Sequence, residues 1–279
     1  MKVYIYAKSG HNIGLEAVRR CASIYSKLKK FDPILCTCDF RAGAYAKDEL
    51  GIKKYVSVDV LTNLPNMMKR GDILIFDSDE TTQFMEEHMN DFCSLLYKVG
   101  TDIPYSIVDD SLFSKNENPN IEKSLFFGDD DYSNLLLELT KNSSKQDINL
   151  LLGHYFFLGN ESKLAPFFNT MFTDEEYINT ISNTKFLLTT SLQSCFESIV
   201  CGNSPVLLLR EDKKYDINFI KDLNIPTINY NENLDKIVLE FEDKISSYPK
   251  LNYINNFDLN PIVKQIGEKI DTFKKLSGI

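Results

Sequence analysis

Short runs rich in β-branched and aromatic residues alternate with amphipathic stretches of helix length along the whole chain. This alternation is typical of parallel β-sheets whose strands are connected by helices packed on the sheet faces. The sequence therefore predicts an α/β protein. Strands are predicted at Lys2–Ala7, Ile34–Cys38, Tyr55–Val58, Ile73–Asp77, Tyr105–Asp109, Ser124–Phe127, Ile148–Leu152, Phe186–Thr190, Val206–Leu209 and Thr227–Ile228.

The helices between these strands are identified by the period of their apolar residues. In the first, from about Gly14 to Lys30, Val18, Cys21, Ala22 and Tyr25 recur at steps of three and four residues and form one buried stripe. Further helices are predicted at Tyr132–Lys141, Glu175–Asn183, Gln193–Cys201, Asn218–Leu223, Leu234–Ser246 and Pro261–Leu276.

The polar segment Ser111–Glu122 contains Pro119 and lacks a sustained apolar period, which is typical of a linker. The chain length of 279 residues corresponds to about two domains. We therefore expect two Rossmann-like domains that face a cleft, formed by residues 1–115 and 116–279. In such sheets ligands bind outside the carboxyl ends of the strands, so the loops at those ends are the candidate sites.

Charge and hydropathy limit the range of partners. Thirty-one basic against forty acidic side chains give a net charge of −9, which disfavours binding to a phosphate backbone, so no nucleic-acid partner is expected. No uninterrupted apolar stretch approaches the roughly 20 residues that span a bilayer, so no transmembrane segment is expected. The apolar run at the start is too short for a signal-peptide core, and a cytoplasmic location is predicted.

The cysteines show neither the paired C-x-x-C spacing of a zinc site nor the density of a secreted disulfide scaffold. We therefore expect reduced and mostly buried thiols. They are Cys21, Cys36, Cys38, Cys93, Cys195 and Cys201.

The first candidate loop, Lys8–Gly14, follows the first strand and opens the first helix. Its small residues let a ligand approach the backbone, and the N–H groups at a helix start favour an anion. His11 is a candidate general base, because the ordinary pKa of histidine is about 6.5. The alternative is a plain strand-to-helix turn with an idle histidine.

The second candidate loop is Phe127–Asp131, in which Gly128 lets the chain turn. The carboxylates, Asp129 among them, can cap the helix that is predicted to begin near Tyr132. They could instead collect a divalent cation, which prefers oxygen ligands. Because no second acidic or histidine cluster has a geometric relation to this loop, capping is the preferred interpretation and no metal is predicted.

The third candidate loop is Thr189–Glu197, between a buried strand and a helix. Ser191, Gln193 and Ser194 supply hydroxyls, an amide and backbone donors around the helix N-terminus, a suitable environment for a diphosphate. Glu197 lies one turn further on, where a carboxylate can accept hydrogen bonds from a ribose diol. The alternative is an N-cap followed by a surface glutamate.

The fourth set of candidates comprises Asp77 and Asp109, at the ends of two predicted strands of the first half, together with the acidic residues that follow each of them. Carboxylates at strand ends can hold a sugar hydroxyl or orient a catalytic side chain. Capping of turns is the alternative explanation.

The order of these loops resembles the nucleotide-sugar hydrolases of pseudaminic acid biosynthesis, which release UDP from a diacetamido sugar and are similar to compact GT-B glycosyltransferases. The family motif I-G-x-G-H-x-x-R is matched at Ile13, Gly14 and Arg20. Glu16 replaces its second glycine, and Ala17 replaces its catalytic histidine.

The resemblance continues over nearly the whole chain. ILIFDSDE and YSIVDD are similar to family strands that end in aspartate, at Asp77 and at Asp109-Asp110. SLFFGDDDYSNLLLEL resembles the strand, glycine turn and helix of the nucleotide-binding half, and in the following helix the ribose-binding role falls to Glu197. A family passage with the motif Y-x-L-x-R-x-E-F is absent between Asp110 and Phe127.

The resemblance implies a GT-B-like protein whose N-terminal domain lies on the acceptor or sugar side and whose C-terminal domain binds the nucleotide. We expect it to transfer a sugar from a UDP-sugar to a glycan or protein acceptor in surface glycan or flagellin glycosylation, with no cofactor. The alternatives are UDP-sugar hydrolysis and a catalytically silent homologue that binds a nucleotide-sugar or serves as a scaffold. The expected ligands of the diphosphate are Gly128, Asp129, Ser191, Gln193 and Ser194, with Glu197 on the ribose, Asn12 and Gly14 on the sugar or phosphates, and His11, Asp77 or Asp109 as base.

Overall fold

The computed structural model describes residues 1–156, 159–252 and 257–277. The chain divides into two compact units, which are described separately. Unit 1 comprises Met1–Gly10, Leu15–Asp109 and the C-terminal segment that contains helix α10 (Asn260–Ser277). Unit 2 comprises His11–Gly14 and the chain from Asp110 through helix α9 (Leu234–Ser246).

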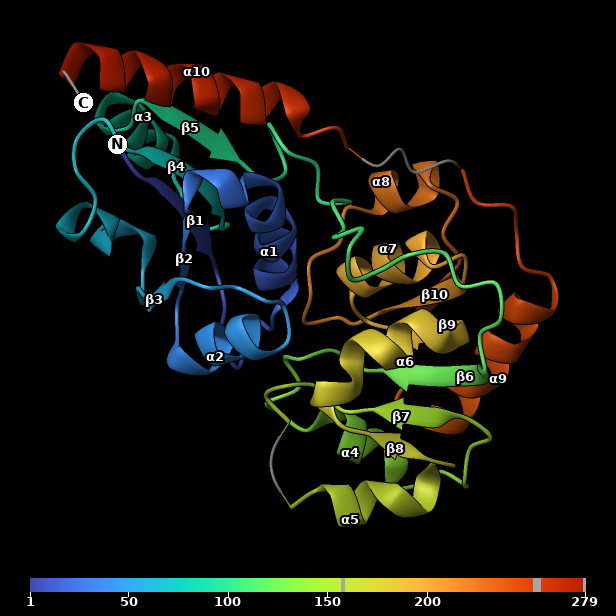
Figure 1. Cartoon of the computed structure of the whole chain (residues 1–279). Helices are drawn as coiled ribbons and strands as arrows, with labels where there is room; N and C mark the ends of the chain where they lie inside the picture. Colours follow the sequence, from blue (N-terminus) through green and yellow to red (C-terminus); the bar gives the residue numbers. More distant parts are fainter. Residues whose placement is uncertain (157–158, 253–256, 278–279) are drawn as a thin grey trace. The chain divides into compact units, whose positions relative to one another are not determined.

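Unit 1 contains a five-stranded parallel sheet with the strand order β3-β2-β1-β4-β5 (Figure 1). All five residues of the central strand β1 are buried, as expected for a parallel sheet that is covered on both faces. The register pairs Tyr4 with Ile34 on one side and Val3 with Ile73 on the other. The strands are β1 (Val3–Ala7), β2 (Ile34–Thr37), β3 (Tyr55–Ser57), β4 (Ile73–Asp77) and β5 (Leu95–Lys98), and the α-helices besides α10 are α1 (Glu16–Leu28), α2 (Phe40–Asp48) and α3 (Gln83–Phe92).

Unit 2 contains a six-stranded parallel sheet with the order β11-β10-β9-β6-β7-β8. Its order reverses between β6 and β9, as that of unit 1 does between β1 and β4, so both units have doubly wound topology. The strands are β6 (Ile121–Phe126), β7 (Asn149–Leu151), β8 (Met171–Phe172), β9 (Thr184–Thr189), β10 (Ser204–Leu209) and β11 (Thr227–Asn229), and the α-helices besides α9 are α4 (Leu135–Thr140), α5 (Glu161–Leu164), α6 (Tyr177–Asn183), α7 (Leu192–Val200) and α8 (Ile217–Asp222).

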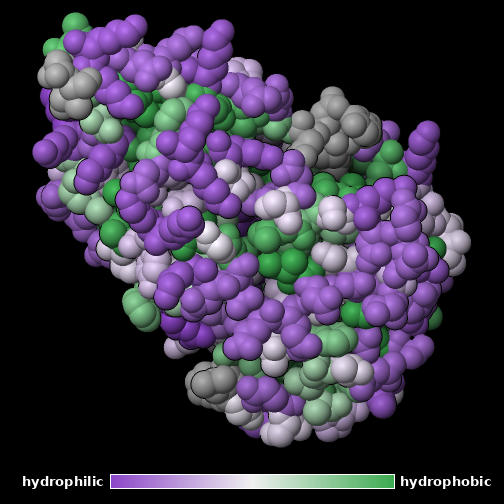
Figure 2. Space-filling view, viewed as in Figure 1, coloured by the Kyte–Doolittle hydropathy of each residue, from purple (hydrophilic) through white to green (hydrophobic). Residues whose placement is uncertain are grey.

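Each sheet carries its own apolar core. In unit 2, Leu125, Leu150, Leu188 and Val206 of four strands pack with Phe241 of α9. In unit 1, aromatic side chains of β1 and β4 pack against the 3₁₀ segment Leu61–Asn66. The face of the molecule seen in Figure 2 is mostly hydrophilic, in keeping with the net charge of −9.

The predicted α/β class is confirmed, but one predicted strand is wrong. Residues Tyr105–Asp109 form no strand, and β5 at Leu95–Lys98 takes the edge position beside β4. Ile107 and Val108 are buried but belong to no β-strand. The apolar run that predicted a strand is therefore a buried loop. Strand β8 was missed because two residues are too few to show alternation.

The domain boundaries differ from the expected ones in two places. The N-terminal part of unit 1 ends at Asp109, whereas the first domain was expected to extend to residue 115. Helix α10 also belongs to unit 1, although residues 116–279 were expected to form one domain. Helix α10 contacts unit 1 through the Tyr97 hydroxyl, which donates to Gln265 Oε1 at 2.8 Å, and through Gly267, which lies next to the ring of Phe31. Figure 1 shows α10 beside β5 and α3.

All six cysteines are free thiols, and four of them are buried, which agrees with the expectation. Burial raises the pKa of Cys36 to about 12, so this thiol is inert at neutral pH. Within the described residues, no helix is both long enough and apolar enough to cross a membrane.

The loops after β6 and β7 approach each other at backbone distance. A Cβ atom on Gly153 would overlap the carbonyl oxygen of Gly128 and would lie 2.8 Å from the Cα atom of Asp129. Neither of these atoms belongs to a flexible side chain that could move aside. Glycine at position 153 is therefore required by the packing of the two loops.

Gly153→Ala is expected to lower the free energy of unfolding by on the order of 1–3 kcal/mol, because the methyl group overpacks two backbone segments. Gly267→Ala is the control, since a Cβ there meets Phe31 at an ordinary 3.5 Å and alanine favours the helix. Urea unfolding of both variants measures the effect. Equal stability of Gly153→Ala and the wild type would contradict the close approach.

Candidate functional site

The strongest candidate site lies at the carboxyl edge of the unit 2 sheet, where β6 and β9 are neighbours. The strand order reverses here, and open α/β sheets bind ligands outside such a point. The Thr190 hydroxyl, directly after β9, donates to the Phe127 carbonyl at 2.6 Å and ties the two loops together. Gly128 has a φ of +101°, and a Cβ atom would lie 2.6 Å from Asp130 Oδ1 and 3.0 Å from Thr190 Oγ1. The side chains of Asp130 and Thr190 therefore pack directly on this glycine turn.

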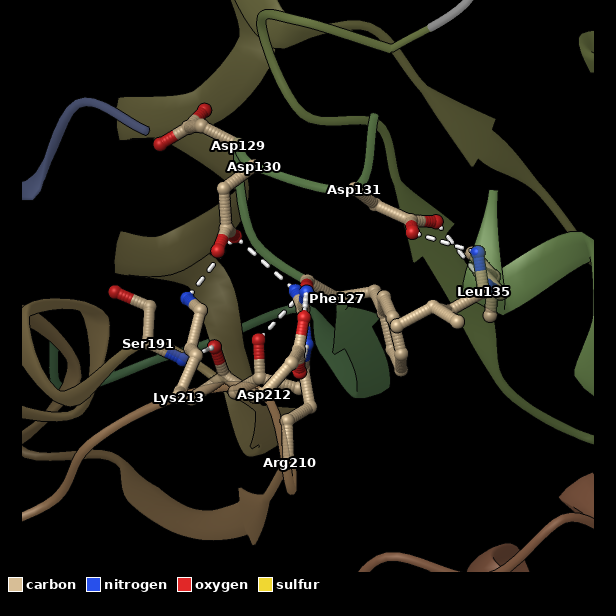
Figure 3. A network of polar contacts seen from close by, with 12 residues as sticks. Phe127, Asp129, Asp130, Asp131, Leu135, Ser191, Arg210, Asp212 and Lys213 are labelled. Atoms are coloured by element: carbon tan, nitrogen blue, oxygen red, sulfur yellow. Dashed lines mark hydrogen bonds and ion pairs between the residues drawn. The ribbon is translucent and has the colours of Figure 1, made fainter. Parts of the chain in front are cut away.

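Each of the three aspartates after Gly128 has its own set of partners, and Figure 3 shows those of Asp130 and Asp131. Asp129 Oδ1 accepts from the backbone N–H of His154 at 3.0 Å. Asp130 Oδ1 is paired with Arg210 Nη1 at 3.1 Å and with Lys213 Nζ at 3.0 Å. Asp131 accepts from the first N–H groups of α4, at 2.7 and 3.1 Å.

These contacts confirm the capping interpretation for Asp131, whose carboxylate satisfies donors at the start of α4. Burial raises its pKa to about 6, although the two hydrogen bonds from the helix oppose this shift. Among the residues that the structure describes, no group of three or more His, Cys, Asp and Glu side chains could hold a metal ion.

Arg210 is the centre of an ion network behind the site. Its side chain is 2% exposed, and it forms a two-pronged contact with Asp212, at 2.9 Å from Nε to Oδ1 and 2.5 Å from Nη2 to Oδ2. The guanidinium also lies 5.1 Å from the centroid of the Phe127 ring. Burial by itself would lower the pKa of Arg210, but the hydrogen bonds to Asp212 and the charge of Asp130 raise it overall. The network joins the loops after β6 and β10.

The N-terminus of α7 faces the same edge. The Ser191 side chain caps the helix by accepting from the N–H of Ser194 at 3.1 Å, and the Ser191 N–H donates to Thr189 Oγ1. Within the described chain, the N–H of Leu192 has no hydrogen-bond acceptor. A backbone donor and the positive end of the helix dipole therefore remain for an anion.

The further residues predicted on α7 form an internal network. Glu197 is 1% exposed, and it accepts from the Tyr177 hydroxyl at 2.5 Å and from Gln193 Nε2 at 3.1 Å. The Ser194 hydroxyl lies 2.7 Å from the Tyr177 hydroxyl. Gln193 and Glu197 share one face of the helix because they are four residues apart, and this face packs on α6.

The structure therefore corrects three expectations on α7. Gln193 and Ser194 direct their side chains at Glu197 and Tyr177, so these groups are engaged inside unit 2. Glu197 is not a surface glutamate: it is 1% exposed, and both of its carboxylate oxygens accept hydrogen bonds inside unit 2. Of the predicted side chains on this loop, only that of Ser191 remains at the edge itself, beside Lys213 (Figure 3).

In unit 1, Asp77 forms a buried ion pair with Arg20, in which Nε donates to Oδ2 at 2.7 Å. The guanidinium lies 5.0 Å from the centroid of the Tyr105 ring. Burial would lower the pKa of Arg20, but the charge and hydrogen bond of Asp77 raise it overall. Asp77 thus holds an arginine of α1, which makes it a poor general base. Asp109 is buried in a loop and not at a strand end, contrary to expectation.

The segment His11–Gly14 groups with unit 2. Gly14 has a φ of +85°, and a Cβ atom there would lie 3.4 Å from Asp129 Cβ. The ring of His11 lies 4.5 Å from that of Tyr132, at an interplanar angle of 47°. His11 and Asn12 are exposed, so the imidazole can meet a ligand.

A histidine–aspartate pair that the sequence pattern did not predict lies at the same edge. His154 Nδ1 lies 2.6 Å from Asp174 Oδ2, which joins the loops after β7 and β8. Polar residues shortly after the ends of two neighbouring strands could have indicated this pair. Because strand β8 was not predicted, Asp174 was not recognised as a residue near a strand end. The pair fixes the orientation of the imidazole beside Asp129, which accepts from the His154 backbone.

A cavity of about 480 Å³ lies in unit 1, lined by apolar side chains that include Leu64, Met68 and Met85. It contains none of the residues predicted to bind or to react.

No protein-family model and no curated protein sequence matches the chain. Among solved structures, a provisionally assigned UDP-N-acetylglucosamine 2-epimerase from Listeria monocytogenes is similar over 98% of both chains, with a TM-score of 0.53 and 13% identity. The Anabaena protein Alr3699/HepE, solved in complex with UDP and glucose, is similar over 98% of this chain and 100% of its own, with a TM-score of 0.51 and 12% identity.

These likenesses define the class of the fold: two parallel-sheet α/β units of the GT-B type. The predicted fold class is confirmed. The resemblance to the pseudaminic acid hydrolases is supported at the level of the GT-B fold and not at the level of that family.

The raised pKa of Asp131 predicts a pH-dependent stability. Because the folded protein binds the proton more tightly than the unfolded chain, the stabilisation is fully present below about pH 4 and is lost as the pH rises through about 6. In Asp131→Asn this titration is absent. Its unfolding free energy relative to the wild type should therefore increase by on the order of 1–3 kcal/mol between pH 4 and pH 7.

Urea unfolding at a series of pH values checks this expectation. Asn233→Ala is the control, because Asn233 caps α9 through Lys236 N–H without a titratable group. The difference between that variant and the wild type should stay constant with pH. A constant difference for Asp131→Asn as well would show that Asp131 does not titrate in this window.

Proposed function

We propose that the chain binds the diphosphate of a UDP-sugar at the carboxyl edge of the unit 2 sheet and uses the UDP-sugar as the donor in a sugar transfer. The observation that carries the proposal is the meeting of two features at the switch point of this sheet. The glycine turn at Gly128 follows β6, and the N-terminus of α7, capped by Ser191, follows β9.

This arrangement suits a diphosphate on physical grounds. A glycine turn lets the anion approach the backbone, and the N–H groups at a helix start offer donors together with the favourable end of the dipole. The Leu192 N–H supplies one such donor within the described chain. The Anabaena protein with a similar fold was solved with UDP and glucose, which makes UDP the first nucleotide to test.

Further roles follow from position. Asn12 and Gly14 belong to a segment that lies beside Asp129, so we assign them to the sugar or the phosphates. His11 is the proposed base, because it is exposed while Asp77 is paired with Arg20. In the transfer, an acceptor hydroxyl oxygen bonds to the anomeric carbon, its proton passes to His11, and the bond to UDP breaks. Hydrolysis would use water in place of the acceptor.

A second candidate function is binding of a nucleotide-sugar without turnover. Ala17 is buried on α1 at the place of the family's catalytic histidine, and Asp77 is held in an ion pair. A positioned general base contributes about 10²- to 10⁴-fold in rate, so its loss would leave a binding protein.

UDP is expected to raise the melting temperature of the wild-type chain. At about 100 times the dissociation constant, binding to the folded state adds about 2.7 kcal/mol of stability. Thermal unfolding with UDP, UDP-N-acetylglucosamine and ADP measures this effect, with ADP as the control for the base. If none of the three changes the melting temperature, the proposed function is wrong.

His11→Ala is expected to reduce the release of UDP from a UDP-sugar by about 10²- to 10⁴-fold, while the affinity for UDP stays near that of the wild type. His88→Ala is the control, because His88 is also exposed but lies on α3 of unit 1. Full turnover in His11→Ala would exclude this residue as the base. Binding without release of UDP in the wild type, with and without acceptors, would favour the second candidate function.

A further inference from the structure

Lys213 lies at the edge of the sheet that we propose as the diphosphate site. A Cβ atom on Gly128 would be 2.6 Å from Asp130 Oδ1 and 3.5 Å from Lys213 Nζ, so the carboxylate and the ammonium group both lie beside this glycine turn. Figure 3 shows Lys213 next to Ser191, the residue that caps α7. The cation thus stands beside both features that carry the proposed function.

Lys213 forms an ion pair with Asp130 Oδ1, and the same oxygen also forms an ion pair with Arg210 (Figure 3). Arg210 has a second, two-pronged contact with Asp212, so its charge is balanced without Asp130. The side chain of Lys213 is 16% exposed, compared with 2% for Arg210. Of the two cations, Lys213 is therefore the one that an entering anion can reach.

We propose that Asp130 is an internal stand-in for a phosphate group, and that Lys213 is a further diphosphate-binding residue which exchanges Asp130 for the ligand. This inference rests on the proposed function and deepens it. A phosphate is a better partner than a single carboxylate, because it carries more charge and more acceptor oxygens for a flexible ammonium group.

The competing explanation is that Asp130 serves only to tie the loop after β6 to the loop after β10. The two explanations differ in the effect of removing the carboxylate charge. If Asp130 competes with the ligand, Asp130→Asn strengthens binding. If Asp130 is only a tie, Asp130→Asn leaves the affinity unchanged or weakens it.

Calorimetric titration with UDP and with inorganic diphosphate tests the proposal. Lys213→Ala is expected to weaken the binding of UDP by about tenfold or more, and Lys213→Arg to retain most of it. Lys214→Ala is the matched control, because it removes the same charge from the adjacent, exposed residue. Asp130→Asn is expected to bind both probes more tightly, with a smaller gain at high salt.

The outcomes separate this inference from the proposed function. A wild-type chain that binds neither UDP nor diphosphate overturns both. If the wild type binds UDP and Lys213→Ala binds it as well as Lys214→Ala does, only the role of Lys213 is wrong. Unchanged or weaker binding by Asp130→Asn overturns the stand-in role. Should Lys213→Ala fail to fold, Lys213→Gln, which keeps the side-chain length without the charge, replaces it in the same titration.

Discussion

The polar edge of unit 2 depends on Arg210, because this buried guanidinium joins loops whose residues are 80 positions apart in the chain. Its guanidinium forms ion pairs with Asp130 of one loop and with Asp212 of the other, and it lies over the Phe127 ring. A buried charge is tolerated only when its partners satisfy it, so the geometry of both loops is coupled to this one side chain. The turn at Gly128 keeps its shape for the same reason.

The two sheets share a topology but differ in what their switch points hold. In unit 1 the edge between β1 and β4 is occupied by the Arg20–Asp77 pair, in which the cation comes from α1. In unit 2 the corresponding edge between β6 and β9 combines a backbone turn, a helix N-terminus and Lys213. Anion binding is therefore better supported in unit 2. The histidine–aspartate pair of His154 and Asp174 lies at the same edge, two loops away.

Much of the fold could be predicted from hydropathy alone, because buried parallel strands are continuous apolar runs. The predictions that the structure contradicts failed for physical reasons. Ile107 and Val108 are as buried as strand residues but belong to no strand, and hydropathy reports burial and not membership of a β-ladder. The candidate loops were found because polar and small residues follow strand ends. Glu197 was misjudged because no local pattern shows that Tyr177, twenty residues earlier, donates to it.

The sequence by itself determined the α/β class, the loops at the switch points and a helix cap among the carboxylates after Gly128. These follow from apolar period, turn residues and short-range hydrogen bonds, which act between neighbours in the chain. Only the tertiary structure decided which charges meet: Arg20 with Asp77, Arg210 and Lys213 with Asp130, and His154 with Asp174. Such partners come together through the strand order, and strand order is a property of the packed sheet that no local stretch of sequence contains.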